Sequence, residues 1–281
     1  MKKILALIIS ILIINTMPVF AKTDRTSAEY LKNKKHFALM NPIAECTAQK
    51  ILKNALKKEV GAGDYKVKFS AYTLSSLRKG IFKSIEIQGK DLEIEEIPVQ
   101  YIKVKTLTDY NWIDITEKPV KIKSDMIFGY EMELTEKSIN KALEKKDYQK
   151  VLENLNKKAY PLFTMHDVRV RIRHNKVHII MDYSLPLSSN KKKKSFMVST
   201  NLEVDNGKIK TTNIGIDNAY GNLPLDKVTN LINLINPLSF TLAELNENNC
   251  KGQVENVKID DNIIQINGKI FIEKKIKESE L

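Results

Sequence analysis

The chain has 281 residues, of which 42% are hydrophobic and 28% are charged. This length allows one large domain or two small ones, and the composition excludes a disordered tail, a collagen-like fibre and a disulfide-dense mini-protein. Lys and Arg number 46 against 34 Asp and Glu, which gives a formal net charge of +12. The excess favours acidic partners such as nucleic acid, anionic lipid or envelope polymers, and charge alone does not choose among them.

The first 21 residues have the pattern of a secretory signal peptide. Lys2 and Lys3 form a positive n-region, residues 4–14 are apolar except for one serine, and Val19-Phe20-Ala21 supplies small residues before a cut. The apolar run is shorter than the roughly 20 residues that span a bilayer. We therefore expect removal of residues 1–21 and export to the periplasm or the cell exterior. Export argues against nucleic acid as a partner.

Two cysteines, Cys46 and Cys250, follow the predicted cut. In an oxidising compartment they could form a disulfide that closes a very long loop. Two separate buried thiols are the alternative, because cysteine is among the most buried residue types. The sequence leaves both open, since it says nothing of the distance between the two.

The N-terminal half of the mature chain begins with a polar leader and then predicts a helix. Residues 22–40 are polar and rich in lysine. Asn41-Pro42 has the pattern of a helix start, with Asn at the cap and Pro at the first helical position. Apolar residues then recur at helical spacing up to Leu56, and Gly61 predicts the end of this helix.

After the helix, the apolar period changes from helical to alternating, which predicts strands with one buried face. Thr135 has the pattern of a helix cap and opens a second helical region that runs to about residue 158. Asp205-Asn206-Gly207 carries the strongest short hairpin signal. The alternating runs lie at 65–71, 84–88, 97–107, 120–134, 168–172, 177–181, 196–202, 254–259 and 263–272.

The order of elements predicts an α+β fold with antiparallel strands rather than a βαβ repeat. A further short helix is predicted from Pro224 to Pro237, and a turn at Asp260-Asp261-Asn262 joins the last two strands. No linker rich in Gly, Pro or Ser divides the chain. We expect a single domain over 41–275 and a tail over 276–281.

Catalytic patterns are weak in this sequence. His166, His174 and His178 lie close together, but their spacing is not that of a helical metal pair. Gly61-Ala62-Gly63 precedes a strand rather than a helix, which fails the structural test for phosphate binding. We expect a protein that is not an enzyme and has no cofactor or metal.

Two segments suggest contact with an anionic membrane surface. The run from Lys191 to Lys194 predicts an exposed loop, which either attracts lipid headgroups or only adds solubility. At the turn around Arg78 and Lys79, apolar residues lie beside basic ones, as at an interface with phospholipid. The alternative is that these apolar side chains fold under and cap the core.

Several of these segments resemble a known family. Leu74-Ser75-Ser76-Leu77-Arg78-Lys79-Gly80 leads into the alternating strand Ile81-Phe82-Lys83-Ser84-Ile85-Glu86-Ile87, and Leu134-Thr135 opens a helix that reaches Ile139-Asn140. The closing hairpin over 254–272 carries Gly268. In this order the chain resembles the LmeA-like phospholipid-binding family of exported bacterial proteins.

The resemblance implies a tubular-lipid-binding-like fold. In such a fold a long N-terminal helix is wrapped by a strongly curved antiparallel sheet that encloses an elongated apolar channel. It implies binding or transfer of phospholipid or another acyl lipid in the cell envelope, without a cofactor. Carrying an acyl chain through water requires a dry surface, because each exposed methylene costs about 0.8 kcal/mol.

On this hypothesis, apolar residues of the helix and strands line the channel and basic residues meet the phosphate at its entrance. The expected lining residues are Ala48, Ile51, Leu52, Ala55 and Leu56 on the helix and Phe69, Ile85 and Ile87 on strands, with Leu77 and Phe82 near the entrance and Arg78 and Lys79 at the phosphate.

Two other functions remain open. The first is a non-enzymatic envelope scaffold that binds an acidic polymer or protein partner through its basic surface, and a filled interior would favour it. The second is a hydrolase of envelope lipid or glycan, which would need a cleft with converging polar groups.

Overall fold

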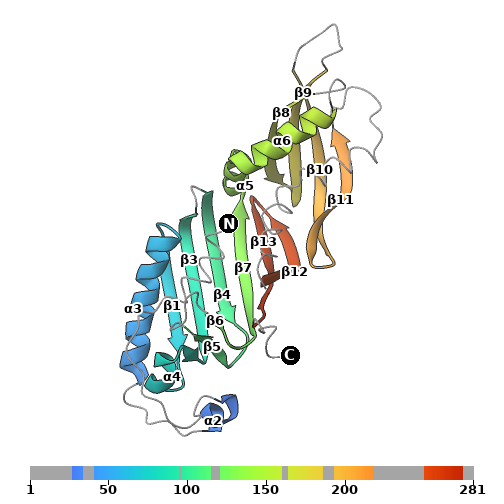
Figure 1. Ribbon diagram of the computed structural model, residues 1–281. Helices are drawn as coiled ribbons and strands as arrows, with labels where there is room; N and C mark the ends of the chain where they lie inside the picture. The colour runs from blue at the N-terminus through green and yellow to red at the C-terminus, as the bar shows by residue number, and fades with distance from the viewer. Residues whose placement is uncertain are drawn as a thin grey trace.

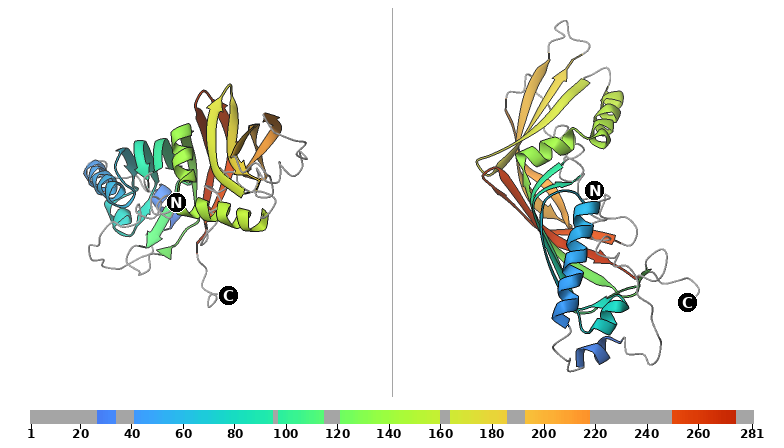
Figure 2. Two further views of the ribbon diagram at one scale, coloured as in Figure 1. Left: turned by 90° about the horizontal axis from the view of Figure 1, so that it is seen from above. Right: turned by 90° about the vertical axis from the view of Figure 1, so that its left-hand side faces the viewer.

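The computed structural model describes residues 27–33, 41–94, 97–114, 121–159, 164–185, 193–217 and 250–274 of the protein. Figure 1 shows an elongated molecule in which two antiparallel sheets lie end to end. The right-hand view of Figure 2 shows the longer helices on one side of these sheets.

The larger sheet has six strands, each antiparallel to its neighbours. Its spatial order is β1 (Asp64–Ser70), β3 (Ser84–Ile94), β4 (Ile97–Thr106), β7 (Met126–Thr135), β13 (Ile263–Ile272) and β12 (Cys250–Asp260). β1 and β12 are therefore the two edges, and the sheet is open.

The second sheet has four strands and abuts β12. Its order is β11 (Lys208–Asp217), β10 (Lys194–Asp205), β9 (Lys176–Ser184) and β8 (Thr164–Arg173). The predicted Asn-Gly hairpin is confirmed, because Asn206 and Gly207 take positive φ values of 49° and 73° between β10 and β11. This turn joins the two sheets, since Val254 N donates to Gly207 O at 2.9 Å.

A small third sheet lies at one end of the molecule (Figure 1), with the strands β2 (Ile81–Phe82), β5 (Asn111–Asp114) and β6 (Lys121–Ile122). The helices of the described residues are α2 (Ala28–Asn33), α3 (Asn41–Glu59), α4 (Leu74–Arg78), α5 (Glu136–Leu143) and α6 (Lys146–Ala159). The helix predicted from Asn41 is confirmed as α3. The cap predicted at Thr135 is confirmed at α5, where Ser138 N donates to Thr135 Oγ1 at 3.1 Å.

One face of the six-stranded sheet is apolar and buried, and the other is polar. The cross-strand register places six residues in a row on the buried face: Val67, Ile87, Val104, Tyr130, Gly268 and Val254. The next row, on the opposite face, is Lys68, Glu86, Lys105, Gly129, Lys269 and Gln253. Residues of α3, α5, α6 and both large sheets share one contiguous core.

The expected α+β fold with a helix wrapped by a curled sheet is wrong. The structure is mostly β, and its large sheets are open rather than closed around a helix. α3 packs mainly against the edge strand β1, and the second sheet continues beyond the other edge instead of folding back over α3. Alternation identifies the buried face of each strand, but strand order decides whether a sheet closes.

Some expected segments lie outside the described residues: the signal peptide 1–21, most of the leader, Lys191 and Lys192, the helix from Pro224 to Pro237, and the tail 276–281. Within the leader, Ala28–Asn33 is helical, and Leu31 packs on Tyr72 and Ile81. In the described part of the chain, no helix has the length and apolar character needed to cross a bilayer.

The free edge of β8 is covered by side chains from α5 and α6. Asn140 accepts from Val170 N at 2.8 Å and donates to Val170 O at 2.9 Å. Asn156 makes the same pair of bonds with Met165, at 2.7 and 2.8 Å. Each asparagine amide thus takes the place of a neighbouring strand and satisfies backbone groups that would otherwise be left unpaired.

We predict that Asn140→Leu lowers the free energy of unfolding by about 1–3 kcal/mol, because it leaves the N–H and C=O of Val170 without partners. Equilibrium unfolding in urea measures the change. The matched control is Asn154→Leu at an exposed position of α6, which should change the stability by less than about 0.5 kcal/mol. Equal effects of the two substitutions would contradict the proposed role of Asn140.

Candidate functional site

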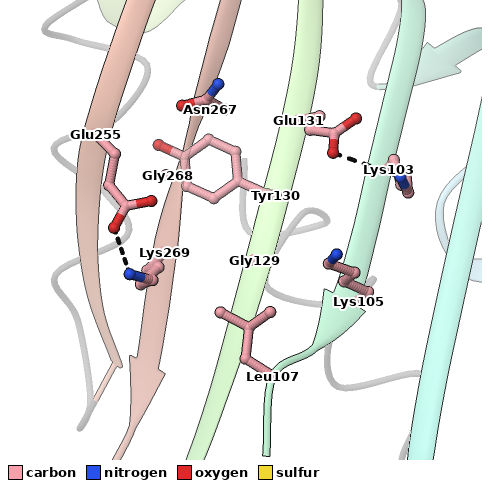
Figure 3. Close-up of a pocket in the computed structure, with 10 residues that line it drawn as sticks. All are labelled: Lys103, Lys105, Leu107, Gly129, Tyr130, Glu131, Glu255, Asn267, Gly268 and Lys269. Carbon is pink, nitrogen blue, oxygen red and sulfur yellow. Dashed lines mark hydrogen bonds and ion pairs between the residues drawn. The ribbon is translucent and has the colours of Figure 1, made fainter.

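A hollow of about 250 Å³ opens on the polar face of the six-stranded sheet (Figure 3). Four neighbouring strands and the residue that follows β4 form it. Its lining consists of Lys103, Lys105, Leu107, Gly129, Tyr130, Glu131, Glu255, Asn267, Gly268 and Lys269. Ligand pockets usually have volumes of about 300–1,000 Å³. The hollow is slightly smaller, so it has room for a small molecule only.

The hollow exists because a glycine occupies the centre of a row of long side chains. Gly129 lies directly between Lys105 on β4 and Lys269 on β13. A β-carbon at Gly129 would lie 3.3 Å from Leu107 Cδ2, so Leu107 forms the wall beside the empty position. The Leu107 side chain is 44% exposed, which is unusual for a large apolar residue in this structure.

Two of the three lysines in the hollow are paired with carboxylates. Lys103 Nζ lies 3.4 Å from Glu131 Oε1, and Lys269 Nζ lies 2.5 Å from Glu255 Oε1. The dashed lines in Figure 3 mark both pairs. In each pair the carboxylate offsets the positive charge of the lysine.

Lys105 has no such partner among the described residues. Glu86 is its cross-strand neighbour, but the Glu86 carboxylate accepts from Lys68 Nζ at 3.0 Å and from Gln88 Nε2 at 2.9 Å. The hydrogen bond from Lys68, a residue of β1, lowers the pKa of Glu86, although burial acts in the opposite direction. The Glu86 carboxylate is thus engaged with β1 rather than with Lys105. Lys105 is therefore the uncompensated cation of the hollow.

Tyr130 lies behind the hollow, on the row that faces the core. Its Oη is buried and makes no hydrogen bond with the part of the chain that the structure describes. Burial raises the pKa of Tyr130 to about 12, with a further contribution from Glu255, so the phenol is neutral at physiological pH. Figure 3 shows the ring of Tyr130 crossing toward Gly268, where a β-carbon would lie 2.8 Å from Oη.

The predicted headgroup residues Arg78 and Lys79 lie at one end of the molecule, at the end of α4 (Figure 1). Thr73 caps this helix, with Ser76 N donating to Thr73 Oγ1 at 2.9 Å. Gly80 then turns the chain into β2 with φ +74°, and its backbone approaches Ile113 so closely that a β-carbon would meet Ile113 O at 1.8 Å.

Aromatic residues that the sequence reasoning did not select lie beside this turn. Trp112 on β5 pairs with Ile81 on β2, and both Trp112 and Tyr110 are half-buried against the small cluster of Leu31, Tyr72 and Ile81. Arg78 and Lys83 are exposed nearby in the chain, while Leu77 is half-buried against the main core. The missed signal is the pairing of β2 with β5, which brings together residues about 30 apart in sequence.

Most of the residues expected to line a channel lie in the packed core. Ala55 and Leu77 are half-buried, and Ile51 is 40% exposed on the outer side of α3. The rings of Phe69 and Phe82 are in contact, with centroids 5.6 Å apart. The buried members of the set are Ala48, Leu52, Leu56, Phe69, Phe82, Ile85 and Ile87.

The burial of these residues argues for packing rather than for an open channel at their side chains. Leu52, Leu56, Ile85 and Ile87 are each 1% exposed or less. An empty channel wide enough for an acyl chain would also admit water and would leave its lining accessible. At these four residues the interior is filled, as in an ordinary protein core.

We predict that Leu52→Ala lowers the free energy of unfolding by about 2–5 kcal/mol, because it leaves a cavity in a packed core. The neighbouring control Ile51→Ala, at an exposed position, should cost less than about 0.5 kcal/mol. Urea unfolding of both variants provides the comparison. A cost below about 1 kcal/mol for Leu52→Ala would indicate that open space surrounds this side chain.

The two cysteines are free and lie far apart. Cys46 is exposed on α3, next to β1, whereas Cys250 is buried on β12 at the opposite edge of the sheet. Five strand spacings of about 4.8 Å separate these edges, well beyond disulfide reach. The structure thus keeps two separate thiols, of which one is buried.

We predict that the native protein, prepared without reductant, exposes one thiol per chain to a thiol-reactive dye. Cys46 should react within minutes, and Cys250 should react only after unfolding, because burial shields it and raises the pKa of its thiol. Titration with Ellman's reagent, with Cys46→Ser as the control, measures this. Finding no free thiol in the unfolded, unreduced chain would show that the two cysteines are bridged.

Among the described residues, His166 and His178 have no carboxylate within hydrogen-bond distance. His178 Nδ1 lies 2.9 Å from Ser199 Oγ, but its Nε2 contacts a backbone carbonyl, that of Arg173, rather than a carboxylate. Among the described residues, His166 Nε2 similarly lies within hydrogen-bond distance of a hydroxyl, Ser184 Oγ, at 2.8 Å. No group of three or more metal-ligating side chains occurs in the described parts of the chain. The geometry therefore gives no support to a hydrolase.

No family model, curated protein or solved structure matches this chain.

Proposed function

We propose that this chain is an exported, non-enzymatic protein of the cell envelope that binds phospholipid at a membrane surface. In this proposal the contact is made by the end of the molecule that contains α4, β2 and β5, which we call the α4 end. The observation that carries the proposal is the presence, on neighbouring elements of this end, of half-buried Trp112 and Tyr110 and of the basic residues Arg78, Lys79 and Lys83.

The side chains at the α4 end have the chemistry of a membrane interface. Trp and Tyr combine a large apolar ring with a polar group, and they are enriched at the level of lipid headgroups. Exposed Arg and Lys are attracted to anionic lipid, each by about 1 kcal/mol close to the surface. The carboxylates Asp109 and Asp114 are also present, and Asp114 is paired with Lys123 at 3.8 Å. The end therefore keeps a positive excess.

The proposal places phospholipid at the surface of the molecule and assigns no acyl chain to the core around Leu52 and Ile87. Their burial, at 1% exposure each, supports this choice. The competing function is a scaffold that binds an acidic polymer or protein through its basic surface. The filled core at these residues is also consistent with the scaffold function. The two functions are distinguished by whether binding to lipid depends on the residues of the α4 end.

The chain contains one tryptophan, Trp112, so intrinsic fluorescence reports directly on the α4 end. We predict a blue shift of the Trp112 emission when the mature protein is mixed with vesicles of phosphatidylglycerol, and no shift with phosphatidylcholine. Arg78→Gln combined with Lys79→Gln should weaken binding to the anionic vesicles at least tenfold, as expected from two lost charges. Vesicle co-sedimentation measures the affinity.

The matched control is Lys57→Gln with Lys58→Gln, which removes the same charge from exposed positions of α3. This variant should bind anionic vesicles within threefold of the wild-type protein. If both double variants lose affinity equally and the Trp112 emission does not shift, attraction is diffuse and the scaffold function is favoured. Absence of binding to anionic vesicles at low salt would refute the proposal.

A further inference from the structure

The hollow over Gly129 lies on the polar face of the six-stranded sheet and has no part in the proposed membrane contact. It combines Lys105, which has no described carboxylate partner, with the exposed apolar side chain of Leu107. We infer that this hollow is a binding site for a small organic monoanion, namely a carboxylate attached to a short apolar group.

The charges of the hollow select for a single negative charge. Lys103, Lys105 and Lys269 face Glu131 and Glu255, which leaves one positive charge in excess. Lys105 is the group whose charge is not satisfied by a described carboxylate, since Glu86 bonds to Lys68 and Gln88. A carboxylate over Gly129 would reach Lys105 on one side and Lys269 on the other, because the register places these two residues on either side of the glycine.

The same arrangement disfavours a dianion. Glu131 and Glu255 belong to the lining, so a second negative charge on the ligand would be repelled. Asn267, also on the lining, supplies an uncharged donor that suits a carboxylate oxygen. Inorganic phosphate, a mixture of monoanion and dianion at neutral pH and without an apolar group, should therefore bind more weakly than a carboxylate that carries one.

The apolar wall sets the second requirement. The side chain of Leu107 remains 44% exposed beside Gly129, and a short apolar group on the ligand would cover it. The volume of about 250 Å³ limits the ligand to a small molecule and excludes a folded partner from the hollow. Burial of apolar surface then adds to the affinity that the carboxylate gains from Lys105.

The test is an NMR titration of the full mature chain, labelled with ¹⁵N, at low salt. Hexanoate is the probe, 1-hexanol is its uncharged analogue, and acetate and inorganic phosphate complete the series. We expect saturable shifts at the amides of Lys105, Gly129 and Lys269 with hexanoate, weaker binding of acetate and phosphate, and no saturable shifts with hexanol.

Two variants locate the site. Lys105→Met should weaken hexanoate binding about tenfold or more, while Lys90→Met, at an exposed lysine of the same sheet face outside the hollow, should change it less than twofold. Gly129→Ala should also abolish binding, because the added methyl fills the floor of the hollow and needs only a small shift of Leu107. Gly215→Ala, where a β-carbon would make only an ordinary contact with Ser199 O at 4.0 Å, is its control.

Saturable shifts that persist in Lys105→Met, or phosphate binding tighter than hexanoate, would overturn the inference. So would the absence of any saturable shift at these amides. Because membrane binding by the α4 end is measured separately, neither result affects the proposed function.

Discussion

The structure depends on one constraint, the fixed cross-strand register of the six-stranded sheet. Side chains alternate between its faces, so the register that places Val104 beside Tyr130 on the core side also places Lys105 beside Gly129 on the open side. A slip by one residue would expose the apolar row and bury the lysines. The core under α3 and the hollow on the opposite face are therefore two consequences of the same pairing.

A second constraint is the way in which the two large sheets are held in an open arrangement. Backbone pairing ends at β12 in the six-stranded sheet and at β8 in the four-stranded sheet, and neither of these strands pairs with β1. Asn140 and Asn156 satisfy the edge of β8 from the side of α5 and α6, and the Gly207 turn bonds to β12. Among the described strands, none joins the β1 edge of the six-stranded sheet to its β12 edge, so this sheet does not close around α3. The basic and aromatic residues of the α4 end and the lysines of the open face thus remain on the surface.

Local features of the sequence predicted local structure well. The Asn41-Pro42 start, the Thr135 cap and the Asn206-Gly207 turn each depend on residues close together in the chain, and the structure contains all three. Strand alternation also identified the buried faces, including Ile85 and Ile87 on β3. What failed was the inference from buried apolar faces to a channel, because alternation does not reveal how tightly a face is covered or whether a sheet closes.

For a related reason, the candidate sites could be predicted only in part from the sequence. Arg78 and Lys79 were selected because a basic turn is visible locally, but Trp112 joins them only through the pairing of β2 with β5. The hollow requires β4, β7, β13 and β12 to lie side by side, which brings Lys105 within reach of residues around position 269. No spacing rule connects such distant residues, and an isolated glycine in a strand gives no sign of which side chains surround it.

The central claim is that phospholipid meets the α4 end and leaves the packed interior undisturbed. Hydrogen–deuterium exchange of the mature protein, with and without phosphatidylglycerol vesicles, tests it most directly, because peptides report on every element at once. We expect slower exchange in the peptides that cover 72–83 and 108–114, with unchanged exchange in α3 and β3. Slower exchange concentrated in α3 and β3, with none at the α4 end, would contradict it and place the lipid in the interior.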